Sequence, residues 1–526
     1  MGIPSYYRTL ITRIPHAIKR AAPPNSATLV VDMNCMIYHV MKEPKMATTV
    51  YSGELGRRGW EHALQEEVCS YLTHIWRSAG SPAQVYVALD GVVPYAKIKQ
   101  QRFRRFKGSS LGAVDAPIPD LSAVGPTWDK NAITPGTEFM ANMGTALRAS
   151  AAKFGWIVSD TSEPGEGEHK VLQWLLKTPL KEGPIIVYGL DADLILLCLI
   201  AGDKLGPSFP IYLLREAMAF GKLIRLDESK NVELGFFQIN VLKESLQGRT
   251  PWTKEQFYDY VFGMSFCGND FLPTGLSLRI RDDGHSILLA GLRDLWATNT
   301  HLVTMDTDNV IRPSAKGLKA FAVWMAKEEE RLTLMTIRRK MSAHLGENHD
   351  DNRPIIEQAE KPMTEIRNEQ VHLRKEWHSI YCRLALGEDT PEHRKTMVSE
   401  FWKGWCWILD YYQGRPVDLE WVYSAGYPPS WSDLVNYFAL PPADSWDTRK
   451  PLEPQEQLAL VLPVSSWGLL SKTGFRNLPA NLPQFWPDTF DTETFGKRFG
   501  WECEPMIPML TPARLRFEVQ RMNTSK

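Results

Sequence analysis

The chain is poor in several features that define common protein classes. It has seven cysteines among 526 residues, and none of them forms a C-x-x-C pair. Neither a disulfide framework nor a structural zinc site fits this spacing. The net charge is −1, with 60 Lys+Arg against 61 Asp+Glu. This balance excludes a globally basic nucleic-acid coat but leaves room for a local basic patch. The scattered thiols predict a reducing, intracellular compartment.

Long hydrophobic runs are also missing. The strongest candidate, PIIVYGLDADLILLCLIAG, is interrupted by two aspartates, and the N-terminal segment lacks the apolar region of a secretory signal. We therefore expect no association with a membrane. What the chain does have is core material, because 44% of its residues are hydrophobic and 11% are aromatic, including 18 tryptophans. Disordered, collagen-like and coiled-coil classes are excluded.

The first 300 residues alternate between short apolar runs and helical patterns. The runs ATLVVDMN, QVYVALDG and PIIVYGLDAD lack polar alternation, as is typical of buried parallel strands. They predict an α/β fold with a mostly parallel sheet flanked by helices and a second, helical and irregular block packed on it. We expect three segments: an α/β domain at 1–315, a charged spacer at 316–375, and a second block at 376–526.

Each of the three apolar runs ends in aspartate. These residues are Asp32, Asp90, and Asp191 with Asp193. Ligands of open parallel sheets bind beyond the carboxyl ends of the strands, and carboxylates gathered there repel one another unless they share cations. Oxygen ligands suit hard divalent ions such as Mg²⁺. Each aspartate alone could instead cap a helix, but three strands ending in this way favour a metal site.

Two further acidic elements could join this group. Glu166 and Glu168 follow a Pro-Gly turn and precede an apolar helix, where they could also simply favour the helix dipole. Asp270, in FCGNDFLP, could alternatively be a turn residue.

A basic segment, KIKQQRFRRFK, follows Asp90. If residues 95–106 are helical, one face carries Lys97, Gln101, Arg104 and Arg105. Such a face suits a terminal phosphate, because Arg binds phosphate oxygens in a bidentate manner. The alternative is a solvated basic helix. Carboxylates able to hold two ions, beside a phosphate clamp, predict hydrolysis of a phosphate ester with the substrate left open.

Several motifs, in one order, resemble the XRN family of 5′→3′ exoribonucleases. They are MGIPSYYRTLITRIP, VVDMN, ALDGVVPYAKIKQQRFRRF, PGEGEHK, YGLDADLILL, LLRE, GNDFLP and LRIRDDG, followed by WILDYYQG, LEPQEQLALVLP and the final WE…IPML…RL. The likeness covers both conserved blocks of the catalytic core, to about residue 516, and we expect no C-terminal extension. It implies a PIN or flap-nuclease-like fold.

The resemblance also assigns roles to residues of this chain. It implies a catalytic and metal-binding set of Asp32, Asp90, Glu166, Glu168, Asp191, Asp193 and Asp270. It implies a substrate-binding set of Lys97, Gln101, Arg104, Arg105, Tyr38 and Trp421. The implied reaction is processive hydrolysis of single-stranded RNA from a 5′-monophosphate end, with two Mg²⁺ (or Mn²⁺) ions and release of nucleoside 5′-monophosphates. The implied location is the cytoplasm, with the nucleus as the alternative.

The chain departs from the family pattern at three positions. Tyr38 stands where the family has a base-stacking histidine, and the neighbouring His39 would point about 100° away on a helix. Cys35 replaces a glycine, and Thr274 replaces a histidine. Trp421 is the candidate for the second stacking face, with a core position as its alternative.

These departures keep other functions open. The first alternative is a weakly active or inactive relative that binds RNA ends or acts as a scaffold. Another is a flap or DNA nuclease with the same strand-end carboxylates, although a closed phosphate pocket favours a terminus over a junction. A phosphatase built on VVDMN is disfavoured, because Asn34 stands where that chemistry needs a second aspartate.

Overall fold

The computed structural model describes residues 5–47, 56–114, 128–219, 232–342, 358–442, 446–471 and 473–524, with residues 3, 49, 51, 222, 223 and 355. The polar segment GENHDDNRP at 346–354 lies outside them. Among the described residues, no helix is both long enough and apolar enough to cross a membrane.

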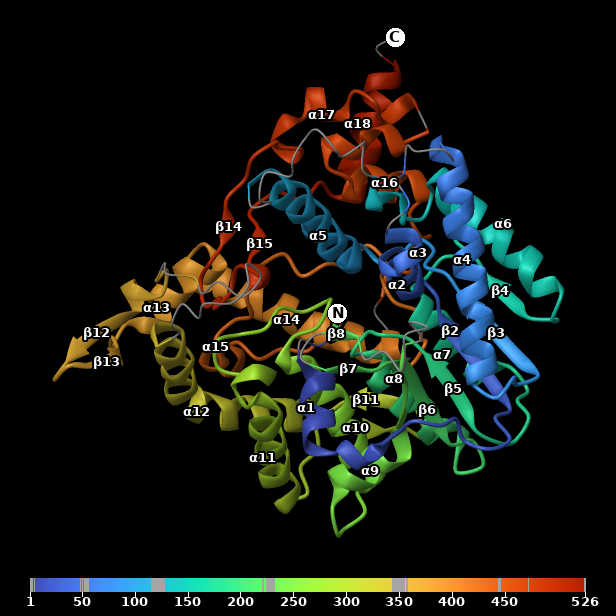
Figure 1. The fold of residues 1–526 in the computed structure, drawn as a ribbon. Coiled ribbons are helices and arrows are strands. Elements are labelled where there is room, and N and C mark those ends of the chain that lie inside the picture. Colours follow the sequence, from blue (N-terminus) through green and yellow to red (C-terminus); the bar gives the residue numbers. More distant parts are fainter. Residues whose placement is uncertain are drawn as a thin grey trace.

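A seven-stranded sheet forms the centre of the first half of the chain (Figure 1). Its strands are β1 (Ile18–Lys19), β2 (Thr28–Asp32), β3 (Gln84–Ala88), β4 (Ile157–Ser159), β5 (Ile185–Tyr188), β6 (Ile211–Glu216) and β9 (Leu234–Gln238). They lie in the order β1-β9-β6-β5-β2-β3-β4. The five strands from β6 to β4 are parallel, whereas β9 is antiparallel to β6 and β1 is antiparallel to β9. The predicted α/β class is confirmed, and the three apolar runs are β2, β3 and β5.

The helices have the following bounds. They are α1 (Tyr6–Arg13), α2 (Asn34–Lys42), α3 (Pro44–Ala47), α4 (Gly56–Ser78), α5 (Tyr95–Val114), α6 (Glu138–Ala152), α7 (Gly167–Lys177), α8 (Leu194–Leu205), α9 (Ile239–Gln247), α10 (Lys254–Gly263), α11 (Gly284–Ala297), α12 (Ala315–Met341), α13 (Trp377–Tyr381), α14 (Pro391–Tyr412), α15 (Trp431–Asn436), α16 (Pro454–Val461), α17 (Leu478–Asn481) and α18 (Pro512–Thr524). The four short hairpins are β7–β8 (Met218–Ala219 and Lys222–Leu223), β10–β11 (Val303–Met305 and Ile311–Pro313), β12–β13 (Thr364–Arg367 and Gln370–Leu373) and β14–β15 (Thr492–Glu493 and Glu504–Pro505).

Helices cover both faces of the sheet, and alternate strand residues point to each. Leu29 and Val31 of β2 belong to a core with α2, α4 and α6, whereas Val30 belongs to a core with α7, α8 and α9. Period-two alternation sends successive strand side chains to opposite faces. Because both faces are buried, each strand must be apolar throughout, which explains the unbroken runs in the sequence.

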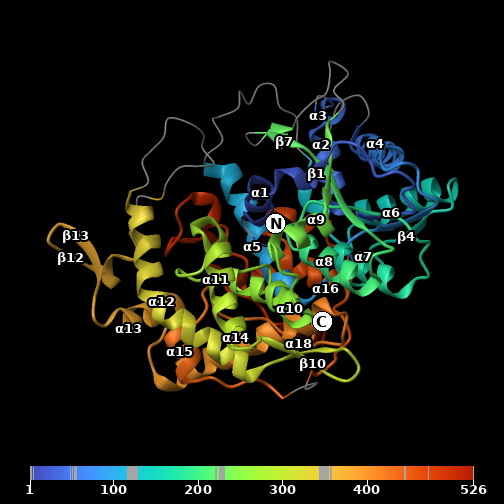
Figure 2. The ribbon, with the colours of Figure 1, turned by 90° about the horizontal axis from the view of Figure 1, so that it is seen from below.

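The core on the α7, α8 and α9 side of the sheet extends into the C-terminal half of the chain. The core that contains Val30 includes Phe321 of α12 and Trp402 of α14. The segment expected to be a spacer therefore contains a helix whose apolar face is part of the main core. In Figures 1 and 2, the β12–β13 hairpin projects away from the body, and α5 lies beside the C-terminal helices. The segment boundaries themselves stay a prediction.

Candidate active site

Three neighbouring strands bring four carboxylates to one edge of the sheet. Asp32 ends β2, Asp90 follows β3, and Asp191 and Asp193 follow β5. The order β5-β2-β3 places these strand ends side by side. Burial, and then the charges of Asp90 and Asp191, raise the pKa of Asp32 well above its usual range. The four carboxylates therefore interact electrostatically and repel one another, as expected for a site that attracts cations.

The start of α7 adds two glutamates to this edge: Glu166 precedes the helix and Glu168 lies in its first turn. The Gly167 amide donates a hydrogen bond of 2.7 Å to Asp90 Oδ1, which fixes the start of the helix against the sheet. A Cβ at position 167 would lie 2.4 Å from Asp32 Oδ1, so only glycine permits this approach. Both glutamates are buried.

Asp270 and Lys97 complete the group. Lys97 Nζ lies 2.6 Å from both Glu166 Oε2 and Asp270 Oδ2, and 3.9 Å from Glu168 Oε1. Burial opposes the charge on this amine, but Asp270 and Glu166 outweigh burial and hold the pKa of Lys97 well above its usual range. Lys97 thus provides a buried counter-charge for three acids. The structure brings all seven predicted carboxylates into one neighbourhood.

Three of these acids have the arrangement of metal ligands. Oxygen atoms of Glu168, Asp191 and Asp193 lie within 4.8 Å of one another. Glu168 Oε2 and both carboxylate oxygens of Asp193 are buried without a hydrogen-bond partner among the described residues. Burial, and then the charge of Asp270, raise the pKa of Asp193 to about 7. Buried, unpartnered oxygens that repel one another fit a hard divalent cation.

Helix α5 carries the residues of the predicted phosphate pocket. It continues beyond the expected residues 95–106 and ends at Val114. Gln101 is buried and accepts a hydrogen bond of 3.4 Å from Gln457 Nε2. Arg105 Nη2 donates to Thr134 Oγ1 at 2.7 Å. Arg104 is exposed and, among the described residues, makes no hydrogen bond or ion pair. The four residues thus differ: Lys97 faces the acids, whereas Arg104 is free for an anion.

Tyr38 lies on α2 and faces the same region. Its ring is 37% exposed, and its phenol is among the groups that act on the Arg105 guanidinium. His39 points away, as expected, because it is buried, packs against Tyr71 with the two rings tilted and their centroids 4.7 Å apart, and lies 3.3 Å from Glu43 Oε1. Cys35, also on α2, lacks the positive φ that favours glycine, and its thiol donates to the Asp32 carbonyl at 3.3 Å. The helix therefore accommodates the loss of glycine.

Trp421 lies in the core. Its side chain is 4% exposed and stacks on Trp407 with ring centroids 5.4 Å apart. A Cβ added at Gly404 would lie 2.5 Å from the Trp421 ring, so that glycine makes room for it. This placement favours the packing interpretation, and a base-stacking role for Trp421 stays a prediction.

The sequence analysis missed two tyrosines that close the site from the second half. Tyr411 Oη donates a hydrogen bond of 3.0 Å to Glu166 Oε1, and its ring stacks on His169 at 4.1 Å. The Tyr412 hydroxyl is buried without a hydrogen-bond partner in the described part of the chain, near the charges of Asp193 and Glu168. Both belong to the motif WILDYYQG. The tyrosine hydroxyls of this apolar helix were a signal in the sequence that could have indicated their place at the site.

These adjacent tyrosines provide a matched pair of variants. Tyr411→Phe leaves a buried carboxylate oxygen without its donor, so we expect the free energy of unfolding to fall by about 1–3 kcal/mol. Tyr412→Phe removes a hydroxyl that has no partner, so we expect no loss or a small gain. Urea denaturation in the presence of a chelator measures both. Equal losses for the two variants would contradict the assignment.

The sequence analysis also missed several polar contacts within the site. Asn34 Nδ2 donates to Asp90 Oδ2 at 2.8 Å, and Gln100 Nε2 donates to Asp270 Oδ1 at 2.9 Å. Lys170 Nζ donates to the carbonyls of Leu89 and Asp160, each at 2.9 Å, and burial lowers the pKa of Lys170 to about 8. These groups orient the carboxylates and the turns that carry them.

Comparisons with known proteins agree with this geometry. The family model for the XRN 5'-3' exonuclease N-terminus matches residues 1–217, and the model for the Xrn1 helical domain matches residues 307–525. Human 5'-3' exoribonuclease 1 is 25% identical over 100% of this chain and 34% of its own length. The Saccharomyces cerevisiae 5'-3' exoribonuclease 1 is 24% identical over 98% of this chain and 43% of its own length.

A relative from Gallus gallus, 5'-3' exoribonuclease 2, is 24% identical over 99% of this chain and 70% of its own length. The chain thus spans less than half the length of the first two relatives. Both family models match in order, and the relatives run along the whole chain. The chain belongs to the XRN family of 5'-3' exonucleases.

Proposed function

We propose that this protein is a 5′→3′ exoribonuclease that hydrolyses single-stranded RNA processively from a 5′-monophosphate end and releases nucleoside 5′-monophosphates. The observation that carries the proposal is the gathering of seven acids from five chain segments next to Lys97 and the free Arg104. The names of the relatives agree with it. The substrate partner is therefore single-stranded RNA.

Two divalent cations, Mg²⁺ or Mn²⁺, fit the acidic site. Glu168, Asp191 and Asp193 would hold one ion, and Asp32, Asp90, Glu166 and Asp270 are the carboxylates left to share the other. When bound, such ions activate water as a nucleophile and stabilise the charge of the leaving oxygen. The protein contributes the orientation of the carboxylates: Gly167 and Asn34 fix Asp90, while Tyr411 fixes Glu166.

The α5 residues would select the RNA end. Arg104 makes no hydrogen bond or ion pair with the described residues, although its charge acts on Asp191, and Arg105 is held beside it through Thr134. Charge-assisted bonds from these groups favour a terminal phosphate over a hydroxyl. The buried side chains of Lys97 and Gln101 close the inner end of this helix face. A pocket closed on one side admits a monophosphate more readily than a larger end.

End-labelled RNA tests this function. Purified protein with Mg²⁺ is incubated with three RNAs that carry a 5′-monophosphate, a 5′-triphosphate or a 5′-hydroxyl, and the products are identified. We expect mononucleotides, released fastest from the monophosphate. Internal cuts, or equal rates on all three RNAs, would overturn the proposal. End-dependent binding without any mononucleotide would instead favour the alternative, an inactive RNA-end-binding relative, which the departures at Tyr38, Cys35 and Thr274 motivate.

Tyr38 has a testable role in processivity. Its exposed ring on α2 can stack on a base, an interaction worth about 1–3 kcal/mol. We therefore expect Tyr38→Ala to shorten the run of nucleotides removed per binding event by roughly tenfold, whereas Tyr38→Phe keeps it. A trap of unlabelled RNA added after binding measures the run length. Unchanged processivity in Tyr38→Ala would assign the stacking role to another residue.

The setting of the protein stays a prediction. All seven cysteines are free thiols. We propose an intracellular, reducing location, in the cytoplasm or alternatively the nucleus.

A further inference from the structure

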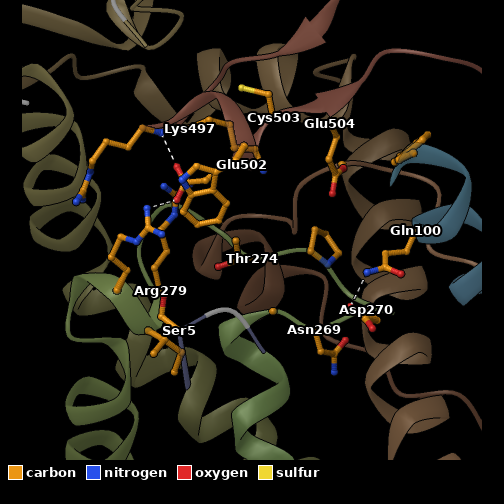
Figure 3. Close-up of a pocket in the computed structure, with 18 of the residues that line it drawn as sticks. Ser5, Gln100, Asn269, Asp270, Thr274, Arg279, Lys497, Glu502, Cys503 and Glu504 are labelled. Atoms are coloured by element: carbon orange, nitrogen blue, oxygen red, sulfur yellow. Dashed lines mark hydrogen bonds and ion pairs between the residues drawn. The ribbon is translucent and has the colours of Figure 1, made fainter. Parts of the chain in front are cut away.

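A cavity of about 450 Å³ opens next to the acidic site, on the outer side of α5 (Figure 3). Gln100 and Asp270 form one wall and belong to the site already described, while Thr274 and Arg279 lie across from them. The far wall comes from residues 497–505, which include Lys497 and Glu502. The volume lies in the range of roughly 300–1,000 Å³ that is usual for small-ligand sites.

Two of the cations that line the cavity have no acidic partner among the described residues. Lys497 Nζ lies 5.3 Å from the centre of the Tyr427 ring and, within the described part of the chain, has no ion pair or hydrogen bond. Arg104, which also lines the cavity, is equally free. By contrast, Asp282 is paired with Arg498 at 2.6 Å. Among the described lining residues the unpaired charges are Lys497, Arg104 and the carboxylate of Glu504, so the cations are in excess, as suits a phosphate backbone.

An exposed aromatic side chain lies in the same lining. Trp501 is 45% exposed although it is large and apolar. The Arg281 guanidinium lies 4.5 Å from the centre of its ring and is itself held by Glu502 Oε1 at 2.5 Å. Phe499 lies nearly parallel to Trp501, at 6.3 Å and 7°. These contacts fix the indole in orientation and leave part of its surface open.

We propose that this cavity binds a nucleotide of the RNA strand that lies beyond the second nucleotide from the 5′ end, with its base on Trp501 and its phosphate near Lys497. Cationic groups with an aromatic platform are the usual means of holding single strands without sequence preference. The proposal rests on the proposed function, since Arg104 joins the cavity to the predicted end pocket. It extends the site from the cleaved nucleotide to the strand that follows.

The test compares substrate lengths. We expect Trp501→Ala to lower kcat/KM about tenfold on a 5′-monophosphorylated 20-mer and to leave a dinucleotide within twofold. Trp501→Phe should keep most of the activity on the 20-mer, and Lys497→Gln should show a smaller, salt-dependent loss. Phe517→Ala is the matched control, because Phe517 is also exposed, at 57%, and has Arg514 5.7 Å from its ring centre.

A second measurement does not depend on activity. With Ca²⁺ in place of Mg²⁺, a 20-mer carrying 4-thiouridine downstream of its first nucleotide should cross-link to the peptide that contains Trp501. Equal kinetics for Trp501→Ala and Phe517→Ala, an equal loss on both lengths, or cross-links confined to other peptides would overturn the inference. If the wild-type protein hydrolyses neither RNA, the proposed function fails. The cross-link still shows whether RNA binds in the cavity.

Discussion

Asp193→Asn is expected to lower kcat by more than about 100-fold while RNA still binds. Asp193 lies with Glu168 and Asp191 in the group suited to a divalent cation, and both of its oxygens are buried and unpartnered. Loss of a residue that merely supports a ligand already costs about 10–100-fold. Single-turnover hydrolysis measures the loss, and titration calorimetry with Mn²⁺ should show a parallel loss of cation affinity.

The same variant should be more stable than the wild type when a chelator is present. Burial and Asp270 raise the pKa of Asp193 from 3.8 to about 7, so the folded protein holds this proton more tightly than the unfolded chain. The wild type therefore loses stability as the pH rises from about 4 to 7, and asparagine removes this dependence. The gain should be largest above pH 7 and absent below pH 4. Thermal unfolding across this range checks the sign, and a lower Tm for the variant at pH 8 would contradict it.

Arg104→Ala is expected to remove most of the preference for a 5′-monophosphate. A hydrogen bond to a charged group contributes about 1.5–3 kcal/mol, so the ratio of kcat/KM between 5′-monophosphate and 5′-hydroxyl RNA should fall by roughly 10- to 100-fold. Because Arg104 is exposed and has no partner among the described residues, its removal should not change the Tm.

Arg77→Ala provides the control for this variant. Arg77 is an exposed arginine in the last turn of α4. It should reproduce the wild-type ratio. If Arg104→Ala lowers the rate on both RNAs equally, the residue contributes general attraction of RNA rather than recognition of the end.

Much of the fold could be predicted from local patterns. The apolar runs of β2, β3 and β5 need no polar alternation because both faces of the sheet are covered. The aspartates at their ends meet at one edge of the sheet because the three strands are parallel. The helical spacing of the α5 cations could equally be predicted from the sequence. In each case, the signal lies within about ten residues, where periodicity determines which side chains share a face.

The rest depended on contacts between distant segments. No local pattern places Lys97 between Glu166 and Asp270, since the three residues come from separate elements. The burial of Trp421 depends on Gly404, which leaves the space for its ring on α14. The expected spacer looked charged because the exposed side of α12 is charged, although the same helix places Phe321 in the core. Composition averages over the two sides of a helix and cannot separate them.

The hydrogen bond from Tyr411 to Glu166 joins residues that are 245 positions apart. During translation, the strands that bear the aspartates emerge from the ribosome long before α14 does. The nascent chain can pair its sheet early, but the cover over Glu166 arrives only 245 residues after Glu166 itself. Biosynthesis thus sets an order in which the acidic pocket is completed only after α14 has left the ribosome.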